Sequence, residues 1–136
     1  MSIETDILTT LQATVTAGRN ASSVPGLPIS YVGVSFNPPN DSKYLEIVHI
    51  PNDPSDVYWS NKQVYQGILR VILHWPKTGS GPYPATDLLS SIVNQFQKGT
   101  RLANDIQIYQ RPKILSSLAQ SNEILYPASI SYKSLQ

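Results

Sequence analysis

The fold is decided by residues 66–102, QGILRVILHWPKTGSGPYPATDLLSSIVNQFQKGTRL. This stretch predicts a long strand, a glycine-rich turn, an amphipathic helix and a glycine that ends the helix. Period-two alternation predicts a strand that places Leu69, Val71 and Leu73 on its core face and ends at Pro76. The strand is long enough to run through most of a sheet.

Downstream of the turn, apolar residues recur with the period of a helix. They occupy positions i, i+3, i+4, i+7, i+8 and i+11: Ala85, Leu88, Leu89, Ile92, Val93 and Phe96. This spacing predicts a helix whose apolar face lies across the sheet. Asp87 falls in its first turn and Lys98 near its end, as the helix dipole favours. Gly99 is expected to form the left-handed cap.

The other elements flank this block. In chain order they are an N-terminal helix, a strand, its antiparallel return strand and two C-terminal strands: residues 2–16, 29–36, 43–50, 106–109 and 123–132. Ser2 is the expected N-cap of the first helix, and Gly18 is expected to end it. Residues 114–120 are predicted to be a connector that can form a short helical turn.

Together these elements predict an α+β fold with a mostly antiparallel sheet, in the order αβββαββ. The N-terminal helix and the central amphipathic helix are expected to cover the sheet. A chain of 136 residues has the size of one domain, so we predict a single domain over residues 1–136.

The composition excludes several classes of protein. The chain has no cysteine, so disulfides, thiolate chemistry and zinc knuckles are excluded. The N-terminus lacks the basic start and apolar run of a signal peptide. The longest apolar run, 68–75, is interrupted by Arg70 and His74 and is too short to span a bilayer. We therefore expect a soluble protein with no membrane partner.

Charge is sparse and unevenly distributed. Charged residues form 14% of the chain, against roughly a quarter in an average domain. Such a surface either stays neutral in a monomer or is covered by other chains. The first half is acidic and the second half is basic, which would allow identical subunits to dock head to tail. Halves of a sequence are poor guides to surface patches, and we expect folding to mix these charges.

The glycine-rich turn invites comparison with a phosphate-binding loop. Gly79-Ser80-Gly81 precedes a helix, but the Lys-Ser/Thr end of a Walker A loop is absent. Pro82 and Pro84 also remove backbone N–H groups that a phosphate would need. Glycines of a tight turn are the better interpretation.

No catalytic, cofactor or metal constellation emerges. His49 and His74 belong to separate strands, and no third ligand is suggested by spacing. A Ser-His-Asp arrangement has no nucleophile-elbow pattern to support it. We therefore predict that the protein is not an enzyme and binds no cofactor or metal.

Two groups of residues are candidate interfaces. Tyr58 and Trp59 lie in a polar, proline-rich segment, where they either plug the core or anchor a partner. A basic run follows the central helix and is interleaved with Tyr109: Lys98, Arg101, Arg111 and Lys113. The net charge of +1 argues against a nucleic-acid surface, so a solvated face or a protein interface is favoured. The candidate subunit or tube interface is therefore Tyr58, Trp59, Arg101, Arg111 and Lys113.

A set of core and turn positions resembles a known family. They are Gly67, the aliphatics 69–73, Pro76, Gly79, Gly81, Ala85, Leu88, Ile92, Phe96, Gly99-Thr100, and upstream the segment 34–39 with Tyr44-Leu45. This pattern is similar to the tail terminator, or tail-tube capping, proteins of long-tailed phages, with a lambda-type terminator fold. The similarity covers nearly the whole chain. The prolines that flank Tyr83 depart from it.

The resemblance implies a structural virion protein at the tail and neck, assembled in the cytoplasm of a host bacterium. Such proteins form a ring, commonly a hexamer, on the last ring of the tail tube, and so stop its polymerisation. The implied partners are further copies of the chain, the tail tube protein and the head-neck connector. DNA passes through the lumen without being read.

Two alternatives remain open. The first is a different ring protein of the neck or head–tail junction. The second is a small-ligand-binding α+β domain that uses the corner between His74 and Gly81. Tube binding separates the first alternative from a terminator, and mass in dilute solution bears on the second.

Overall fold

The computed structural model describes residues 3–22, 25–37, 43–52, 55–56, 63–76, 83–103, 105–119 and 123–135. The predicted Ser2 cap, the Gly79–Gly81 corner, Tyr58 and Trp59 lie outside these residues. The helices are α1 (Ile3–Asn20), α2 (Tyr83–Val93) and a short 3₁₀ turn, η1 (Asn94–Phe96). The strands are β1 (Ile29–Ser30), β2 (Tyr44–Pro51), β3 (Ser55–Asp56), β4 (Gln63–Pro76), β5 (Arg101–Leu102), β6 (Ile106–Ile108), β7 (Lys113–Ile114), β8 (Leu118–Ala119) and β9 (Glu123–Leu135).

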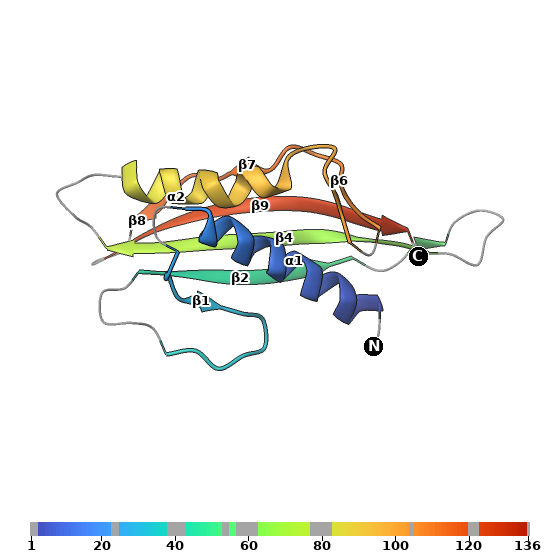
Figure 1. The fold of residues 1–136 in the computed structure, drawn as a ribbon, viewed down its shortest axis with the longest axis horizontal. Helices are drawn as coiled ribbons and strands as arrows, with labels where there is room; N and C mark the ends of the chain where they lie inside the picture. Colours follow the sequence, from blue (N-terminus) through green and yellow to red (C-terminus); the bar gives the residue numbers. More distant parts are fainter. Residues whose placement is uncertain are drawn as a thin grey trace.

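These strands form one sheet in the described part of the chain (Figure 1). The order is β1-β2-β4-β9-β6-β5, with β3 paired to β4 and both β7 and β8 paired to β9. Every pairing is antiparallel except that of β1 with β2. The prediction of an α+β fold with a mostly antiparallel sheet is confirmed.

The long strands β4 and β9 form the centre of the sheet. They pair from Val64 opposite Leu135 to Pro76 opposite Glu123. This register aligns Leu69, Val71 and Leu73 with Ile130, Ala128 and Tyr126, and all six side chains are buried. Since neighbouring residues of a strand point to opposite faces, this register fixes which face becomes the core.

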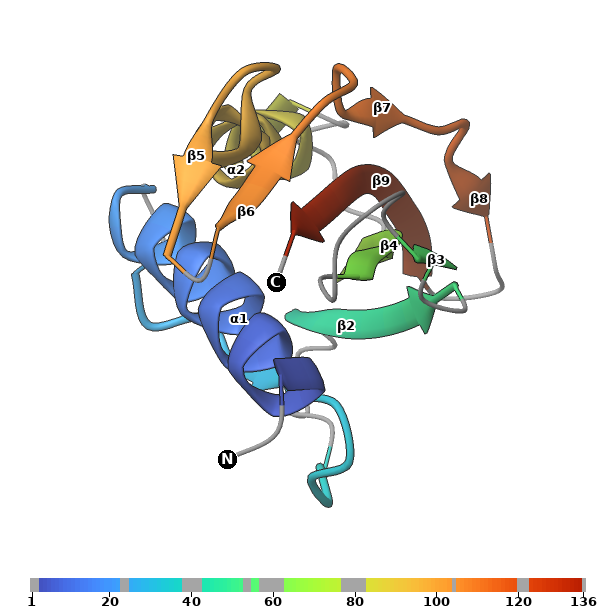
Figure 2. The ribbon, with the colours of Figure 1, turned by 90° about the vertical axis from the view of Figure 1, so that its right-hand side faces the viewer.

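Both helices cover that buried face (Figures 1 and 2). They contribute one apolar stripe each: Ile7, Leu11 and Val15 from α1, and Ala85, Leu88, Leu89 and Ile92 from α2. The predicted stripe of the central helix is confirmed, and Phe96 of η1 extends it into the core. Burying such side chains supplies most of the driving force for folding.

Gly18 does not end the first helix, as predicted, but lies inside it. Helix α1 continues to Asn20, and Gly18 is buried against α2. A Cβ atom on Gly18 would come within 2.8 Å of the Ile92 Cα. Gly18 is therefore needed for the close crossing of the two helices.

Gly99 has the predicted left-handed backbone conformation, but it does not cap the helix. Its φ is +89°, but the 3₁₀ turn already ends at Phe96, with Gln97 in an extended conformation. The N–H of Gly99 donates to the Ile108 carbonyl at 2.7 Å. Gly99 thus turns the chain toward β6 instead of capping the helix.

The predicted strand at 29–36, with an antiparallel return strand, is wrong in length and direction. Only β1 forms, and it pairs with β2 in parallel, Ile29 opposite Leu45. A turn follows, in which the Val34 N–H donates to the Tyr31 carbonyl at 3.2 Å. Helix α1 holds this segment, because the Val32 N–H donates to Gln12 Oε1 at 3.0 Å. A side chain of the helix thus accepts from a backbone N–H that the predicted strand would have paired with its neighbour.

The predicted connector 114–120 contains no helical turn where it is described. It instead contributes to β7 and β8, which pair with β9. The Leu115 N–H also donates to the Pro127 carbonyl at 2.9 Å. Residues 106–119 therefore run along β9 as an interrupted strand. Neither described helix has the length and hydropathy that a membrane span requires.

Candidate functional site

The predicted interface residues have different positions in the structure. Tyr58 and Trp59 are outside the described residues, so their assignment to core or interface stays a prediction. Arg101 in β5, Arg111 before β7 and Lys113 in β7 are all exposed. Their exposure leaves them accessible to a partner.

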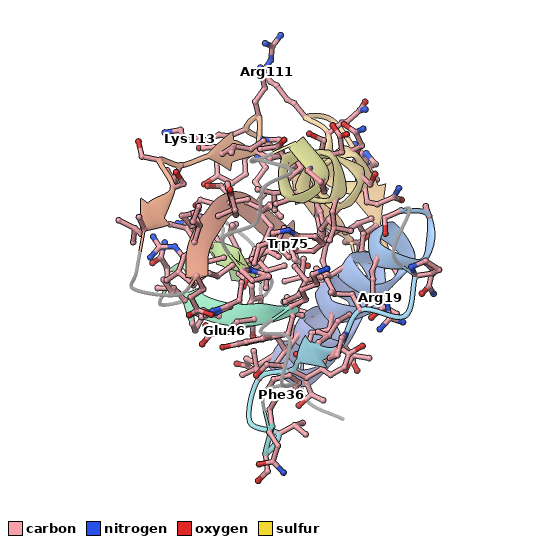
Figure 3. The ribbon with its side chains drawn as sticks, turned by 90° about the vertical axis from the view of Figure 1, so that its left-hand side faces the viewer. Arg19, Phe36, Glu46, Trp75, Arg111 and Lys113 are labelled. Carbon is pink, nitrogen blue, oxygen red and sulfur yellow. The ribbon has the colours of Figure 1, made fainter. Side chains whose placement is uncertain are left out.

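The basic run does not form one patch. In the view of Figure 2, β5 and β7 lie on either side of α2. Arg101 is opposite Gln107, whose other neighbour is Lys133, whereas Lys113 is opposite Ser129. Arg111 and Lys113 lie on the same side of the molecule in Figure 3. The structure therefore brings together only part of the predicted basic surface.

Within the predicted basic run, the structure brings Arg111 close to Lys98. Arg111 lines an open hollow of about 420 Å³ with Lys98 and Gln97. Both cations are exposed, where an ion pair with a partner contributes more to orientation and association rate than to affinity. This hollow adds a positive site next to β7.

The exposed edge of the sheet at β7 and β8 carries apolar side chains. We call residues 111–119 the β7–β8 edge. Ile114 is 53% exposed, Leu115 39% and Leu118 59%. Single exposed apolar residues are ordinary, but three within five positions are an unusual concentration. The sequence pattern does not reveal this edge, because the i, i+1, i+4 spacing of its apolar residues resembles one helical turn.

A cluster of ionisable side chains links three strands on the sheet face opposite the helices. Nε2 of His74 in β4 is 3.0 Å from Glu46 Oε1 in β2, and Nδ1 is 3.4 Å from Glu123 Oε1 in β9. Tyr44 stacks on the His74 ring with a centroid separation of 4.1 Å. Burial, and then the carboxylates of Glu123 and Glu46, raise the pKa of Tyr44. The cluster holds β2, β4 and β9 in register.

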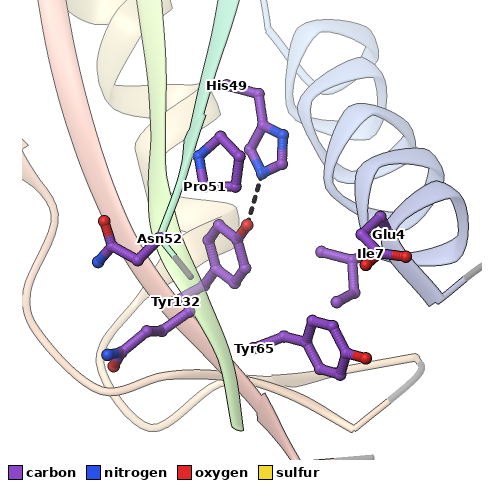
Figure 4. A pocket seen from close by; sticks show the side chains of 8 residues that line it. Glu4, Ile7, His49, Pro51, Asn52, Tyr65 and Tyr132 are labelled. Carbon is purple, nitrogen blue, oxygen red and sulfur yellow. Dashed lines mark hydrogen bonds between the residues drawn. The ribbon is translucent and has the colours of Figure 1, made fainter. Parts of the chain in front are cut away.

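A small cavity lies between the first turn of α1 and the first residues of β4 (Figure 4). It measures about 200 Å³ and is lined by Glu4, Ile7, His49, Pro51, Asn52, Tyr65, Gln66 and Tyr132. Tyr132 Oη and His49 Nε2 are 2.5 Å apart. Burial raises the pKa of Tyr132 to about 12 and lowers the pKa of His49. At neutral pH the uncharged tyrosine can therefore donate to a neutral histidine.

Gly67 leaves the space that this pair occupies. A Cβ atom there would lie 2.7 Å from the Ile50 carbonyl oxygen and 3.0 Å from Tyr132 Oη. The glycine in the middle of β4 thus permits close approach of β2 and the tyrosine hydroxyl. The cavity is best explained as part of the packing between α1 and the sheet.

The described side chains are not arranged in a way that suggests catalysis or metal binding. His49 and His74 lie on opposite faces of the sheet, since His49 is opposite the core residue Leu69 and His74 is opposite Tyr44. Among the residues with described positions, no three His, Asp or Glu side chains form a group that could hold a metal ion. The exposed features that remain are suited to contacts with other proteins.

The comparison with protein families agrees with a structural role. The model of a family described as "Phage tail terminator protein" matches residues 6–132. One solved structure without a functional description has a TM-score of 0.79 at 18% identity, covering 100% of this chain and 96% of its own. That likeness shows a shared fold.

A second solved structure, the virion of a native gene transfer agent particle, has a TM-score of 0.47 at 13% identity. The alignment covers 93% of this chain and 96% of the chain in that structure. No curated protein sequence matches the chain. Because the family model spans nearly all of the sequence, the chain belongs to the phage tail terminator protein family.

Proposed function

We propose that this chain caps the phage tail tube as a ring of identical subunits, with six as the expected number. The match to the terminator family over residues 6–132 carries the proposal. One face of the ring would copy the surface by which one tube ring binds the next. The opposite face would lack that surface, so polymerisation would stop.

The exposed residues support an interfacial mechanism. The β7–β8 edge combines Ile114, Leu115 and Leu118 with Arg111 and Lys113 on a chain that is only 14% charged. Interfaces commonly place apolar side chains at the centre and polar groups at the rim. The free ring face would dock the head-neck connector, and DNA would pass through the lumen without base contacts.

The same proposal gives the protein's domain organisation, its place in the virion and the compartment where it assembles. A single tail-terminator-like domain over residues 1–136 would join the tail and neck of the virion, with assembly in the host bacterial cytoplasm. No cofactor is needed, because capping is a steric effect of binding. The Tyr58–Trp59 segment would supply a further anchor to a subunit or to the tube.

Tube elongation in vitro tests the proposal. Purified protein is added to growing tubes of the matching tube protein, and length and end structure are measured by electron microscopy. We expect elongation to stop, with one ring at the tube end. Tubes that keep growing at saturating protein would falsify the proposal. Binding to neck proteins without binding to tubes would instead identify a head–tail joining ring.

A matched pair of variants separates capping from folding. Leu118→Glu places a charge on the β7–β8 edge, and Ser90→Glu places the same charge on an exposed position of α2. We expect Leu118→Glu to lose capping while its thermal unfolding stays close to wild type. Ser90→Glu is expected to cap normally. Equal capping by both variants would exclude this edge from the working surface.

A further inference from the structure

Arg70 lies in the middle of the central strand β4, on the sheet face that the helices leave open. Its neighbours along the strand, Leu69 and Val71, are buried beneath α1 and α2, so the Arg70 side chain points to the opposite face. The Nε atom of Arg70 is buried and has no hydrogen-bond partner. Buried polar side-chain atoms are nearly always hydrogen-bonded, and this donor is the exception among the described residues.

No carboxylate in the described part of the chain neutralises Arg70. Glu46 and Glu123 lie on the same sheet face, but their Oε1 atoms contact His74 Nε2 and Nδ1, at 3.0 and 3.4 Å. A partly buried charge without a counter-ion is costly to keep, and an apolar residue of similar volume is often at least as stable in its place. Arg70 is therefore better suited to recognition of an anion than to stabilisation of the sheet.

The register of the sheet brings a hydroxyl group and a second cation into line with Arg70. Ser129 of β9 is opposite Arg70, and Lys113 of β7 is opposite Ser129, so the three side chains share one face. Two strand spacings put the Cα atoms of Arg70 and Lys113 about 10 Å apart. Both side chains are long enough to reach an oxygen atom held over Ser129, whose hydroxyl is a further donor.

Apolar side chains surround this row of donors. Val48 is opposite Arg70 in β2, and Ile68 and Ile72 flank it along β4; all three are half-buried on the same face. Apolar surface around a charge excludes water and strengthens its pairing with an anion. An acidic side chain with apolar neighbours in its own chain matches this face. A nucleic acid would bring further phosphates over the apolar side chains, where they would lose hydration without gaining a cation.

We propose that Arg70, Ser129 and Lys113 form a binding site for the carboxylate of an acidic side chain carried by a partner protein. The Arg70 guanidinium donates from Nε and one Nη to the two carboxylate oxygens, in the bidentate arrangement that arginine favours. The Ser129 hydroxyl donates a further hydrogen bond, and the Lys113 ammonium group adds positive charge from the solvent side. Apolar residues beside the acidic residue of the partner cover Ile68 and Ile72. This site goes beyond the proposed capping function and does not depend on it.

Two short peptides test the site on the full-length chain. One carries a glutamate between leucines, and the matched peptide carries glutamine in its place; both are labelled with fluorescein. Fluorescence anisotropy measures affinity, and the NMR signal of the Arg70 Nε–H group reports where the peptide binds. We expect the glutamate peptide to bind at least about tenfold more tightly, which corresponds to about 1.4 kcal/mol, and to shift that signal. Equal binding of the two peptides, or binding that leaves the signal unchanged, would overturn the proposal.

Variants separate recognition from folding. Arg70→Met is expected to weaken binding of the glutamate peptide about tenfold, while its thermal unfolding stays at or above that of wild type. Lys113→Met should weaken binding only about two- to fivefold, because Lys113 is exposed. Arg101→Met, which removes an exposed cation from β5, is the matched control and should bind like wild type.

Two further results would count against the site. Wild-type affinity in Arg70→Met would exclude Arg70 from peptide binding. A labelled DNA duplex that binds wild type more tightly than the glutamate peptide, and that loses this binding in Arg70→Met, would identify a nucleic-acid site and overturn the proposal. The peptide comparison uses the wild-type chain, so it decides the question even if Arg70→Met fails to fold.

Discussion

Leu73 in β4 and Leu118 in β8 belong to one sheet but have opposite surroundings. Leu73 is fully buried beneath the helices, whereas Leu118 is 59% exposed on the β7–β8 edge. The first removes apolar surface from water within the chain, and the second leaves that surface available to a partner. The difference separates a residue that maintains the fold from a residue whose proposed role is contact with a partner.

The same substitution at both leucines should give the largest contrast. Leu73→Ala is expected to lower the free energy of unfolding by about 2–5 kcal/mol, because it leaves a cavity in the core. Leu118→Ala is expected to change it by less than about 0.5 kcal/mol. Urea denaturation followed by circular dichroism measures both values. Similar losses at the two sites would mean that Leu118 is covered within the monomer.

Alkaline pH should lower the stability of the folded core, because it ionises the buried Tyr132. Burial raises the pKa of Tyr132 to about 12, against about 10 in an unfolded chain. The contribution of the neutral tyrosine is fully present below pH 10 and is lost as pH rises through 12. This loss amounts to about 2–3 kcal/mol.

Tyr132→Phe isolates this effect. The variant should be less stable at pH 8, since it lacks the contact with His49 Nε2, but its stability should decline less between pH 10 and 12. Thermal unfolding across this range provides the measurement. Parallel pH profiles for wild type and variant would show that Tyr132 titrates normally.

The helix crossing gives a smaller expected effect. Gly18→Ala puts a methyl group within 2.8 Å of the Ile92 Cα, so α1 and α2 must move apart. We expect a loss of about 1–3 kcal/mol in the free energy of unfolding. Gly26→Ala is the matched control, because no atom lies within 4 Å of its added Cβ. A stabilised Gly18→Ala would show that the crossing relaxes without cost.

Acid should give the smallest change. Burial lowers the pKa of His49, so the unfolded chain binds a proton there more readily than the folded chain. Stability is expected to fall as pH drops below about 6.5, the ordinary histidine value. His49→Gln removes this titration, and the difference between the two acid profiles measures it. Identical profiles would contradict the lowered pKa.

The elements that sequence periodicity predicted well are the long ones. Strand β4 and helix α2 have their predicted core faces, because a repeat of two or 3.6 residues assigns each side chain to a face. Strand β9 forms where a strand was predicted. The basic residues Arg101, Arg111 and Lys113 are exposed, and their part in an interface stays a prediction. For Tyr58 and Trp59, the described residues provide no test.

The errors fall where distant contacts override a local pattern. Residues 29–36 alternate like a strand, but the side chain of Gln12 in α1 takes the Val32 N–H. Gly18 resembles a helix stop, but the approach of Ile92 requires a glycine there. Ile114, Leu115 and Leu118 resemble a helical turn until pairing with β9 extends the segment. No window of neighbouring residues contains these partners.

The sequence by itself determined the α+β class, the central strand and helix, and the resemblance to tail terminators. Each depends on short-range periodicity or on a spread of core positions that survives without the structure. The tertiary structure alone decided the direction of β1, the crossing at Gly18 and the exposure of the β7–β8 edge. These features arise from contacts between segments far apart in the chain, which no local pattern of residues records.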